Sequence, residues 1–213
     1  MSGSPLRGLY PIIDTGACLR AGVKPVDLAK AIARAGVSTA QFRHKGLFTR
    51  DALLDADRIG SILRAARIRY IINDRSDVAL MVGADGVHLG QQDLQPAAGR
   101  RMVGSSVWLG YSTHNANQLR AAGSEPVDYL AIGPVFATGA KENPDPVVGP
   151  DVLPELRRLT SKPLVGIGGI TRQNALQVLA SGLDAVAVIS DLLPAPPTTL
   201  EERLDQWLQL TEP

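Results

Sequence analysis

A short pattern that recurs along the chain constrains its fold more than any other feature. The segments VGADGVHLG (82–90), EPVDYLAIG (125–133) and SGLDAVAVIS (181–190) each place an acidic residue before a short β-rich run, which a glycine or serine closes. In two of them a glycine precedes the acidic residue, as is typical where a helix ends and a strand begins. The recurring unit is therefore a helix, a turn and a strand.

The same unit extends over the whole chain and predicts eight strands with helices between them. Strands separated by helices pair in parallel, and eight such units close into a (β/α)8 TIM barrel. We expect one barrel domain over residues 1–213; an open, doubly wound sheet is the alternative, but it does not normally need eight strands so regularly spaced. Strands are expected at 9–14, 39–43, 69–74, 86–90, 108–112, 127–133, 163–168 and 185–190. Helical periodicity marks, among others, 26–36, 49–66, 115–123, 150–160, 171–182 and 198–210.

Composition and charge exclude several classes of protein. The 22 basic and 21 acidic side chains nearly cancel, so the chain offers no broad basic surface to nucleic acid. No apolar run approaches the ~20 residues of a membrane span, and the first residues lack the apolar stretch of a signal peptide. The one cysteine, Cys18, excludes internal disulfides and multi-cysteine zinc sites and is interpreted as a small buried group. We expect a cytoplasmic protein and leave a homo-oligomer open.

Polar residues gather at the predicted strand ends, where barrels carry their chemistry. Any one of them alone could be a cap, a turn residue or half of a surface ion pair. Their convergence on one rim is what indicates a ligand site. They are Gln41, Arg43 and Lys45 at the second strand, Asn73 and Asp74 at the third, Asp93 after the fourth, Ser112 at the fifth, Thr138 and Lys141 after the sixth, Gly168 and Gly169 after the seventh, and Ser190 after the eighth.

Two kinds of anion site are indicated. Glycines in VGIGGIT, after the seventh strand, would let a phosphate approach backbone N–H groups. The cations Arg43, Lys45 and Lys141, in contrast, accompany the carboxylates of Asp74 and Asp93. Carboxylates beside cations suit a diphosphate with Mg²⁺, which proteins hold through one or two carboxylates and phosphate oxygens.

Other chemistries find less support in the sequence. The histidines His44, His88 and His114 lack the spacing of zinc ligands, and no G-x-S-x-G nucleophile motif is present. His88 lies in mid-strand among apolar residues and is interpreted as a group of the barrel interior.

The motifs, taken together, resemble those of the thiamine phosphate synthase family over nearly the whole chain. They are LYPIID, QFRHK (Gln-Leu-Arg-Glu-Lys in the family), INDR, GADGVHLGQQD, STH, GPVFATGAK, GIGGI and AVIS, in this order. The resemblance implies that 4-amino-2-methyl-5-(diphosphooxymethyl)pyrimidine couples to a thiazole phosphate, giving thiamine phosphate and diphosphate. It implies early breaking of the bond to diphosphate, without a protein nucleophile.

The resemblance also implies the roles of individual residues. Asp74 and Asp93 would bind Mg²⁺. Independently of the resemblance, segment 137–149 is the candidate lid, because it is rich in glycine and proline and longer than a usual connection. Arg43, Lys45, Ser112 and Lys141 would be the catalytic groups. The pyrimidine diphosphate would be bound by Gln41, Phe42, Arg43, His44, Lys45, Asn73, Ser112 and Lys141. The thiazole phosphate would be bound by Thr138, Gly139, Ala140, Gly169, Ile189 and Ser190.

Two departures from the family pattern keep alternatives open. Ala140 stands where a second threonine is usual, and His44 where a glutamate is usual. A thiazole tautomerase of the same superfamily is one alternative, although that branch carries a histidine in place of Pro134 and lacks the glutamine found here as Gln41. A catalytically silent phosphate-binding paralogue is the other, although the retained acidic pair does not favour it.

Overall fold

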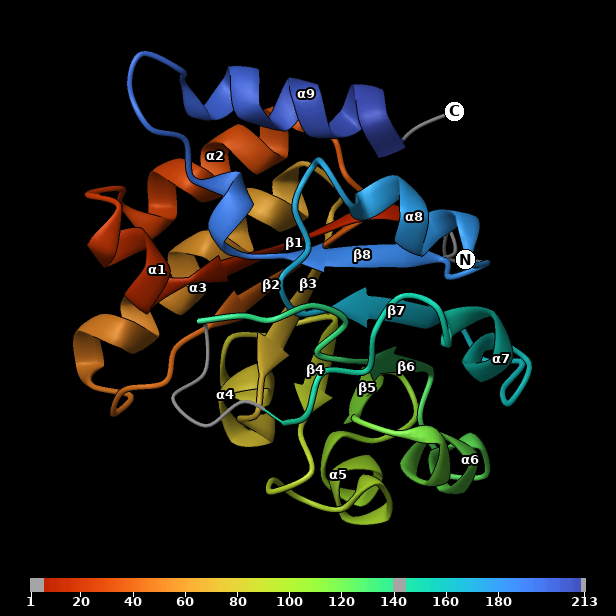
Figure 1. Ribbon diagram of the computed structural model, residues 1–213. Coiled ribbons are helices and arrows are strands. Elements are labelled where there is room, and N and C mark those ends of the chain that lie inside the picture. The colour runs from red at the N-terminus through yellow and green to blue at the C-terminus, as the bar shows by residue number, and fades with distance from the viewer. Residues whose placement is uncertain (1–5, 140–144, 212–213) are drawn as a thin grey trace.

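A closed barrel of eight parallel strands forms the centre of the computed structural model, which describes residues 6–139 and 145–211 (Figure 1). Each strand pairs with the next along the chain, and β8 pairs with β1 to close the ring. The expected (β/α)8 TIM barrel is confirmed. The strands are β1 (Gly8–Asp14), β2 (Thr39–Arg43), β3 (Arg69–Asn73), β4 (Gly86–Leu89), β5 (Trp108–Thr113), β6 (Tyr129–Ile132), β7 (Leu164–Ile167) and β8 (Ala185–Val188).

Helices surround the barrel and cover its outer face (Figure 1). Those singled out by periodicity are present, and α7 and α8 are shorter than their patterns. Within the described ranges, no helix is both long and apolar enough to cross a membrane. The helices are α1 (Thr15–Arg20), α2 (Pro25–Ala35), α3 (Arg50–Ala65), α4 (Ser76–Met81), α5 (Pro96–Val103), α6 (Ala116–Gly123), α7 (Leu153–Arg157), α8 (Ala175–Ala180), the 3-10 helix η1 (Ser190–Leu192) and α9 (Leu200–Thr211).

The structure explains the acidic residue of the recurring sequence pattern. Asp85, Asp128 and Asp184 lie just before β4, β6 and β8, and each accepts a hydrogen bond from a backbone N–H at the start of the preceding strand. The donors are Tyr70 at 2.8 Å, Leu109 at 2.7 Å and Leu164 at 2.8 Å, respectively. The carboxylates thereby satisfy donors at the lower rim of the barrel, where the ladder begins. The motif is thus a structural device.

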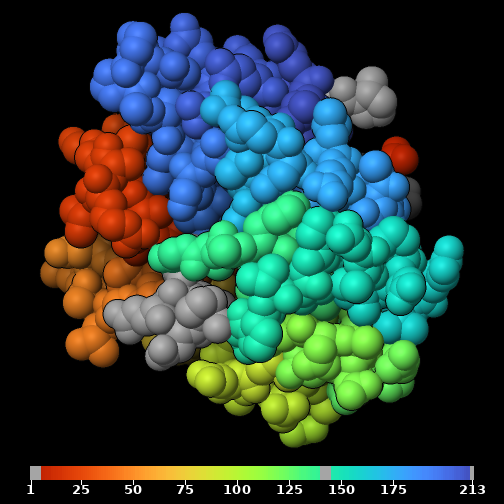
Figure 2. Space-filling model, in the orientation of Figure 1, coloured from red at the N-terminus to blue at the C-terminus, as the bar shows by residue number. Residues whose placement is uncertain are grey.

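Helix α2 shows how local sequence produces the outer layer. Pro25 occupies its first turn, where a missing N–H is harmless, and Gly36 ends it with a left-handed φ of 77°. Leu28 and Ile32 are buried on one face, and burial of each contributes roughly 1.5–3 kcal/mol. Helix α9 packs beside α2 and contacts β1, so the C-terminal segment lies against the N-terminal one (Figures 1 and 2).

Alternation along the strands divides the core into two layers. One apolar cluster lies between strands and helices and includes Phe42. The other fills the barrel and includes Tyr10, Ile71, Tyr129 and Val165. Because successive side chains of a strand point to opposite faces, every second residue of a strand faces the barrel axis. The polar residues at the inward positions therefore meet at the upper rim.

Candidate functional site

The inward positions near the strand ends carry polar side chains, as the sequence predicts. Gln41 and Arg43 lie on β2, Asn73 ends β3 and Ser112 lies on β5. Gln41 and Asn73 are buried, whereas Arg43 and Ser112 are partly exposed. The barrel places these four residues near one rim, where Arg43 and Ser112 reach solvent.

Arg43 already has a partner in the structure. Its Nη1 donates to Oδ2 of Asp14, the last residue of β1, while Oδ1 of Asp14 accepts from the N–H of Ala17 at 2.7 Å and caps α1. Both side chains are mostly buried. Asp14 therefore fixes the guanidinium at the rim. Sequence reasoning missed this role, and the position of Asp14 at a strand end was the available indication.

Lys45 and the two carboxylates predicted to bind metal also meet. Nζ of Lys45 donates to Oδ2 of Asp74 at 2.5 Å, and Oδ2 of Asp93 accepts from the N–H of Gly90 at 2.7 Å. Burial raises the pKa of the Asp93 carboxyl, and its hydrogen bond to Asp74 raises that pKa further. Asp74 has a left-handed φ of 63°, which for a non-glycine residue marks local strain. The loops thus hold two carboxyl groups side by side.

This pair of carboxylates fits a Mg²⁺ site completed by a substrate. Two adjacent acidic groups disfavour each other's ionisation, and a divalent cation would remove that repulsion. Among the described residues no group of three or more acidic, histidine or cysteine side chains forms a complete cage. Mg²⁺ commonly takes its remaining ligands from phosphate oxygens and water. The donor set therefore suits a metal that arrives with a phosphorylated ligand.

Asn73 carries a donor without an acceptor. Its side chain is 8% exposed, and Nδ2 makes no hydrogen bond within the described part of the chain. A buried polar atom left unpaired costs about 1–3 kcal/mol. An acceptor on a bound ligand would remove this penalty, so Asn73 fits its predicted place in a binding site.

Two other residues predicted for the same site use their side chains for contacts within the chain. The side chain of Phe42 packs in the outer apolar cluster, so any contact of Phe42 with a ligand must come from its backbone. His44 is held by Thr15, whose Oγ1 lies 2.9 Å from Nδ1, and by the carbonyl oxygen of Leu47, 3.1 Å from Nε2. His44, which stands where the family usually has a glutamate, thus connects the loop after β2 to α1 through a hydrogen bond.

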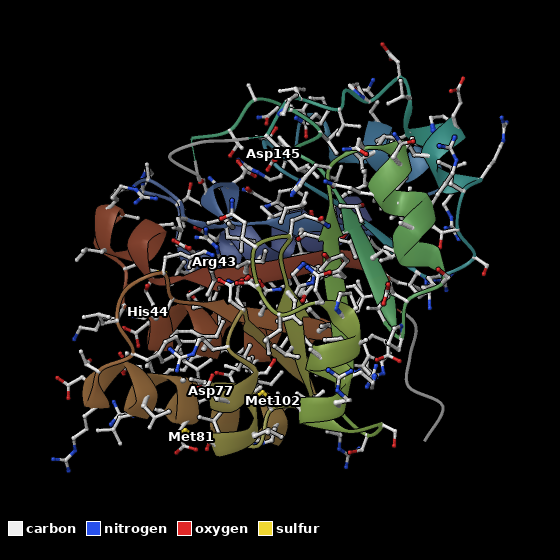
Figure 3. All side chains as sticks on the ribbon, turned by 90° about the horizontal axis from the view of Figure 1, so that it is seen from below. Arg43, His44, Asp77, Met81, Met102 and Asp145 are labelled. Atoms are coloured by element: carbon white, nitrogen blue, oxygen red, sulfur yellow. The ribbon has the colours of Figure 1, made fainter. Side chains whose placement is uncertain are left out.

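The loop after β6 is described only in part. Lys141 and Ala140 lie outside the described residues, and so does part of the candidate lid. Thr138 is partly exposed and Gly139 is exposed. After the gap, Asp145 is labelled in Figure 3. Its Oδ2 lies 3.4 Å from Nε2 of His114, which connects this loop to the end of β5.

The glycines after β7 make room for the neighbouring loop. Gly168 and Gly169 have left-handed φ values of 96° and 64°, and a Cβ on Gly169 would lie 2.4 Å from the carbonyl oxygen of Ala137. The N–H of Phe136 donates to the Gly168 carbonyl at 3.0 Å. No described residue accepts a hydrogen bond from the N–H of Gly169 or of Ser190. These donors remain available to an anion.

Asp191, which sequence reasoning did not select, supports this second part of the site. Its Oδ2 accepts from Nε of Arg172 at 2.9 Å, which ties the loop after β7 to the segment after β8. Its carbonyl oxygen accepts from Arg203 at 2.8 Å and from Nε1 of Trp207 at 3.3 Å. Ile189 and Ser190 are therefore held from α9.

Two sequence interpretations of single residues are confirmed. His88 lies inside the barrel, and its Nε2 is 2.8 Å from Oγ of Ser112. Cys18 is a free, buried thiol, and burial raises its pKa to about 12.

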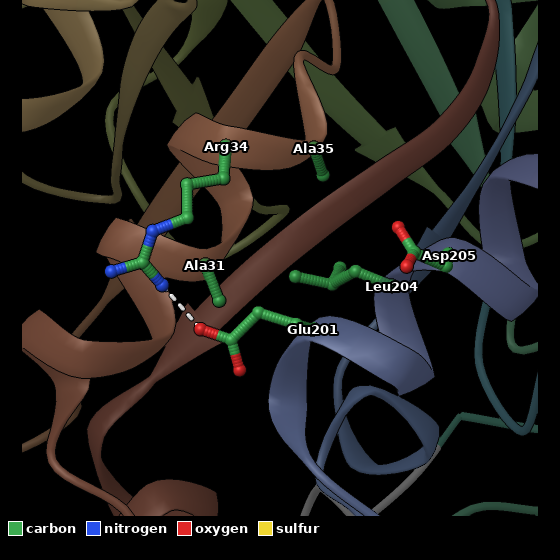
Figure 4. A pocket seen from close by; sticks show the side chains of 6 residues that line it. All are labelled: Ala31, Arg34, Ala35, Glu201, Leu204 and Asp205. Atoms are coloured by element: carbon green, nitrogen blue, oxygen red, sulfur yellow. Dashed lines mark hydrogen bonds and ion pairs between the residues drawn. The ribbon is translucent and has the colours of Figure 1, made fainter.

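A hollow of about 220 Å³ lies elsewhere, between α2 and α9 (Figure 4). The ion pair between Arg34 and Glu201 borders it, and Ala31 and Leu204 contribute its apolar wall. It contains none of the residues predicted for binding. We therefore place the functional site at the rim of the barrel.

Comparison with known proteins identifies relatives of one family. The family model described as thiamine monophosphate synthase matches residues 9–192. The thiamine-phosphate synthase of Koribacter versatilis is 45% identical and the alignment covers 98% of each chain. That of Chloroflexus aurantiacus is 38% identical, covering 92% of this chain and 89% of its own. A solved thiamine phosphate pyrophosphorylase from Pyrococcus furiosus superposes with a TM-score of 0.81 at 29% identity, covering 96% of each chain.

Proposed function

This chain belongs to the thiamine monophosphate synthase family, and from this premise we propose how its barrel rim performs the thiamine-phosphate synthase reaction. The proposed substrates are the pyrimidine methyl diphosphate and the thiazole phosphate. The observation that carries the placement is the meeting of Lys45, Asp74 and Asp93 after three neighbouring strands. Cation and acidic pair together suit a diphosphate accompanied by a metal.

The pyrimidine diphosphate would occupy the half of the rim over β2 to β5. Gln41, Asn73 and Ser112 would bind the polar atoms of the substrate from the barrel interior. Arg43 and Lys45 would bind the diphosphate, and Lys141 would approach from the loop after β6. Support comes from the unpaired Nδ2 of Asn73 and from the partly exposed positions of Arg43 and Ser112.

Asp74 and Asp93 would hold Mg²⁺ beside this diphosphate. When bound, the ion would neutralise negative charge on the leaving diphosphate. Lys45 would then exchange its contact with Asp74 for one with a phosphate oxygen. The two carboxylates already lie close enough to share a hydrogen bond, which supports their service as neighbouring ligands.

The chain accelerates the reaction by electrostatics and positioning. As the carbon–oxygen bond breaks, charge grows on the departing diphosphate, and Arg43, Lys45 and Lys141 stabilise it more strongly than they stabilise the bound substrate. The thiazole nitrogen then attacks the electron-poor pyrimidine methylene carbon. No protein nucleophile takes part, so alignment of the two substrates supplies much of the remaining rate advantage.

The thiazole phosphate would bind across the rim, over β6 to β8. The N–H groups of Gly169 and of the segment Ile189 to Ser190 would bind its phosphate. Thr138, with Gly139 and Ala140, would approach from the neighbouring loop. Support comes from the backbone donors that lack acceptors among the described residues. Asp191 would keep this half of the site in place.

A coupled assay tests the proposal. The protein is mixed with both phosphorylated substrates and Mg²⁺, and release of diphosphate and formation of thiamine phosphate are measured. We expect equal amounts of the two products and none when either substrate is omitted. Conversion of the thiazole phosphate alone into an isomer, without diphosphate, would instead identify a tautomerase. Binding of both substrates without turnover would identify a silent paralogue.

A further inference from the structure

A chain of buried hydrogen bonds crosses the barrel interior beneath the proposed pyrimidine site. Nε2 of Gln41 donates to Oη of Tyr10 at 2.9 Å, and this oxygen lies 2.9 Å from Oη of Tyr129. The Tyr129 oxygen is 3.0 Å from Nδ1 of His88, whose Nε2 is 2.8 Å from Oγ of Ser112. Five strands contribute one residue each. The two ends of the chain are residues of the proposed substrate site.

This chain of hydrogen bonds fits inside the barrel because β5 has a glycine, Gly110, beside it. A Cβ on Gly110 would lie 2.2 Å from Cζ of Tyr129 and 2.5 Å from Nδ1 of His88. Alanine at this position would therefore displace both partners. Tyr10 and Tyr129 are almost fully buried, whereas Ser112 is partly exposed at the rim. The chain leads from the interior toward the ligand.

The protons of the chain can be placed by counting donors and acceptors. Burial raises the pKa of Tyr10 to about 12 and that of Tyr129 well above its usual value, so each phenol keeps one proton at neutral pH. Oη of Tyr10 accepts a hydrogen bond from Gln41, so the Tyr10 hydroxyl must itself donate to Oη of Tyr129. Tyr129 then donates to Nδ1 of His88. If any of these hydrogen bonds ran in the opposite direction while Gln41 still donated to Tyr10, one phenol hydroxyl would be buried without an acceptor.

His88 is thereby fixed as the neutral tautomer with its proton on Nε2. This proton points to Oγ of Ser112, so the hydroxyl proton of Ser112 is directed to the ligand. At the other end, the amide nitrogen of Gln41 is engaged by Tyr10. Its Oε1 makes no hydrogen bond with any described residue and is presented as an acceptor.

We propose that Tyr10, Tyr129 and His88 are positioning residues that make Gln41 a hydrogen-bond acceptor and Ser112 a donor toward the pyrimidine substrate. This inference rests on the proposed function. It predicts selection of an aminopyrimidine, which offers an amine donor and acceptor atoms, against the oxo analogue, in which an acceptor replaces the amine. A site that hydrogen-bonds one polar group strongly rejects an analogue with the wrong group. We therefore expect kcat/KM for the aminopyrimidine to exceed that for the oxo analogue by at least ~10²-fold.

The tautomer of His88 provides a test that does not depend on activity. ¹⁵N NMR of the histidine-labelled protein distinguishes the two neutral tautomers, and His44→Gln and His114→Gln variants assign the signals. We expect His88 with its proton on Nε2. A proton on Nδ1, or on both nitrogens, would overturn the proposal even if the enzyme makes thiamine phosphate. Absence of that activity with the expected tautomer would instead count against the proposed function.

Tyr129→Phe tests whether the buried chain of hydrogen bonds controls the choice of substrate. Losing one neutral hydrogen bond should raise KM for the pyrimidine diphosphate roughly tenfold and weaken rejection of the oxo analogue by a similar factor, with KM for the thiazole phosphate unchanged. Tyr70→Phe is the matched control, because this buried phenol donates to the carbonyl of Ala56 outside the barrel. Equal effects in the two variants would show a merely structural role. If Tyr129→Phe does not fold, Tyr10→Phe replaces it.

Discussion

At the scale of single residues, two of the predicted site cations lie within the described ranges, and both form ion pairs with carboxylates of the chain. Arg43 is bonded to Asp14 and Lys45 to Asp74. A bound diphosphate must therefore compete with carboxylates for both cations. The first pair is mostly buried and the second more exposed, so we expect breaking the Lys45–Asp74 pair to cost less free energy than breaking the Arg43–Asp14 pair.

Arg43→Ala tests the stabilisation of the leaving group. We expect kcat to fall roughly 10²–10³-fold, because a preorganised donor to developing charge contributes about 2.7–4 kcal/mol. Diphosphate release under saturating substrates measures it. Arg34→Ala, at an exposed pair on α2, serves as the control. Arg43→Ala leaves the buried Asp14 carboxylate unpaired, so adding Asp14→Asn should recover the lost stability without recovering kcat. A fall in kcat of less than threefold in Arg43→Ala would show that Arg43 is peripheral.

Asp93→Asn tests the metal site while keeping an oxygen for the N–H of Gly90. Removing one of two like charges should not lower the melting temperature, since burial and Asp74 already disfavour the charged carboxyl. Turnover should become insensitive to added Mg²⁺ and fall to a residual level. A Mg²⁺ titration of diphosphate release measures this, with Asp77→Asn as control on the surface pair with Arg75. An unaltered Mg²⁺ dependence would rule out Asp93 as a ligand.

At the scale of elements, the strand ends follow from sequence more closely than the helix ends do. β2 begins and ends as predicted: Ala40 and Phe42 pack in the outer apolar cluster, and the polar residues of the strand alternate with them. Helix α8 was expected over 171–182 and occupies Ala175–Ala180. The side chain of Asn174 accepts from the N–H of Thr171 at 2.8 Å and forms a turn where the pattern predicts helix.

Gly169→Ala tests the contact between the loops after β6 and β7. The substitution places a side chain at a left-handed φ and against the Ala137 carbonyl, so we expect a loss of about 1–2 kcal/mol in the free energy of unfolding. KM for the thiazole phosphate should rise more than KM for the pyrimidine diphosphate. Gly123→Ala at the end of α6, where a Cβ meets nothing closer than 4.0 Å, is the control. Equal changes in the two KM values would contradict the assignment.

At the scale of the whole molecule, α9 joins the last strand end to the first helices. It packs on α2 and reaches Asp191 through Arg203 and Trp207. The end of the chain therefore stabilises both the closure of the barrel and one half of the site. Stability and the thiazole-phosphate half of the site should depend on the same contacts.

Trp207→Ala tests this coupling. Trp207 is fully buried, so its loss should lower the free energy of unfolding by about 3–5 kcal/mol. Chemical denaturation measures the change, and Leu176→Ala, at an exposed position on α8, should stay within about 0.5 kcal/mol of the parent. Below its unfolding temperature the variant should also bind thiazole phosphate more weakly. Unchanged binding would show that Asp191 is held without α9.

The sequence by itself determined the order of the strands, the barrel and most of the residues at its rim. It could do so because periodicity, caps and the alternation of strands and helices are local properties. It also brought Gln41, Asn73, Asp74, Asp93 and Ser112 to one end, since all parallel strands of a barrel end at the same rim.

Only the tertiary structure decided which side chains are partners. Asp14 and Arg43 are 29 positions apart, Tyr10 and Tyr129 are 119 apart, and His88 and Tyr129 are 41 apart. Such contacts depend on the stagger of neighbouring strands and on the space left by Gly110, neither of which has a local signature. The donor and acceptor roles of Gln41 and Ser112 also depend on the tertiary structure, because they follow only when every partner in the buried chain of hydrogen bonds is known.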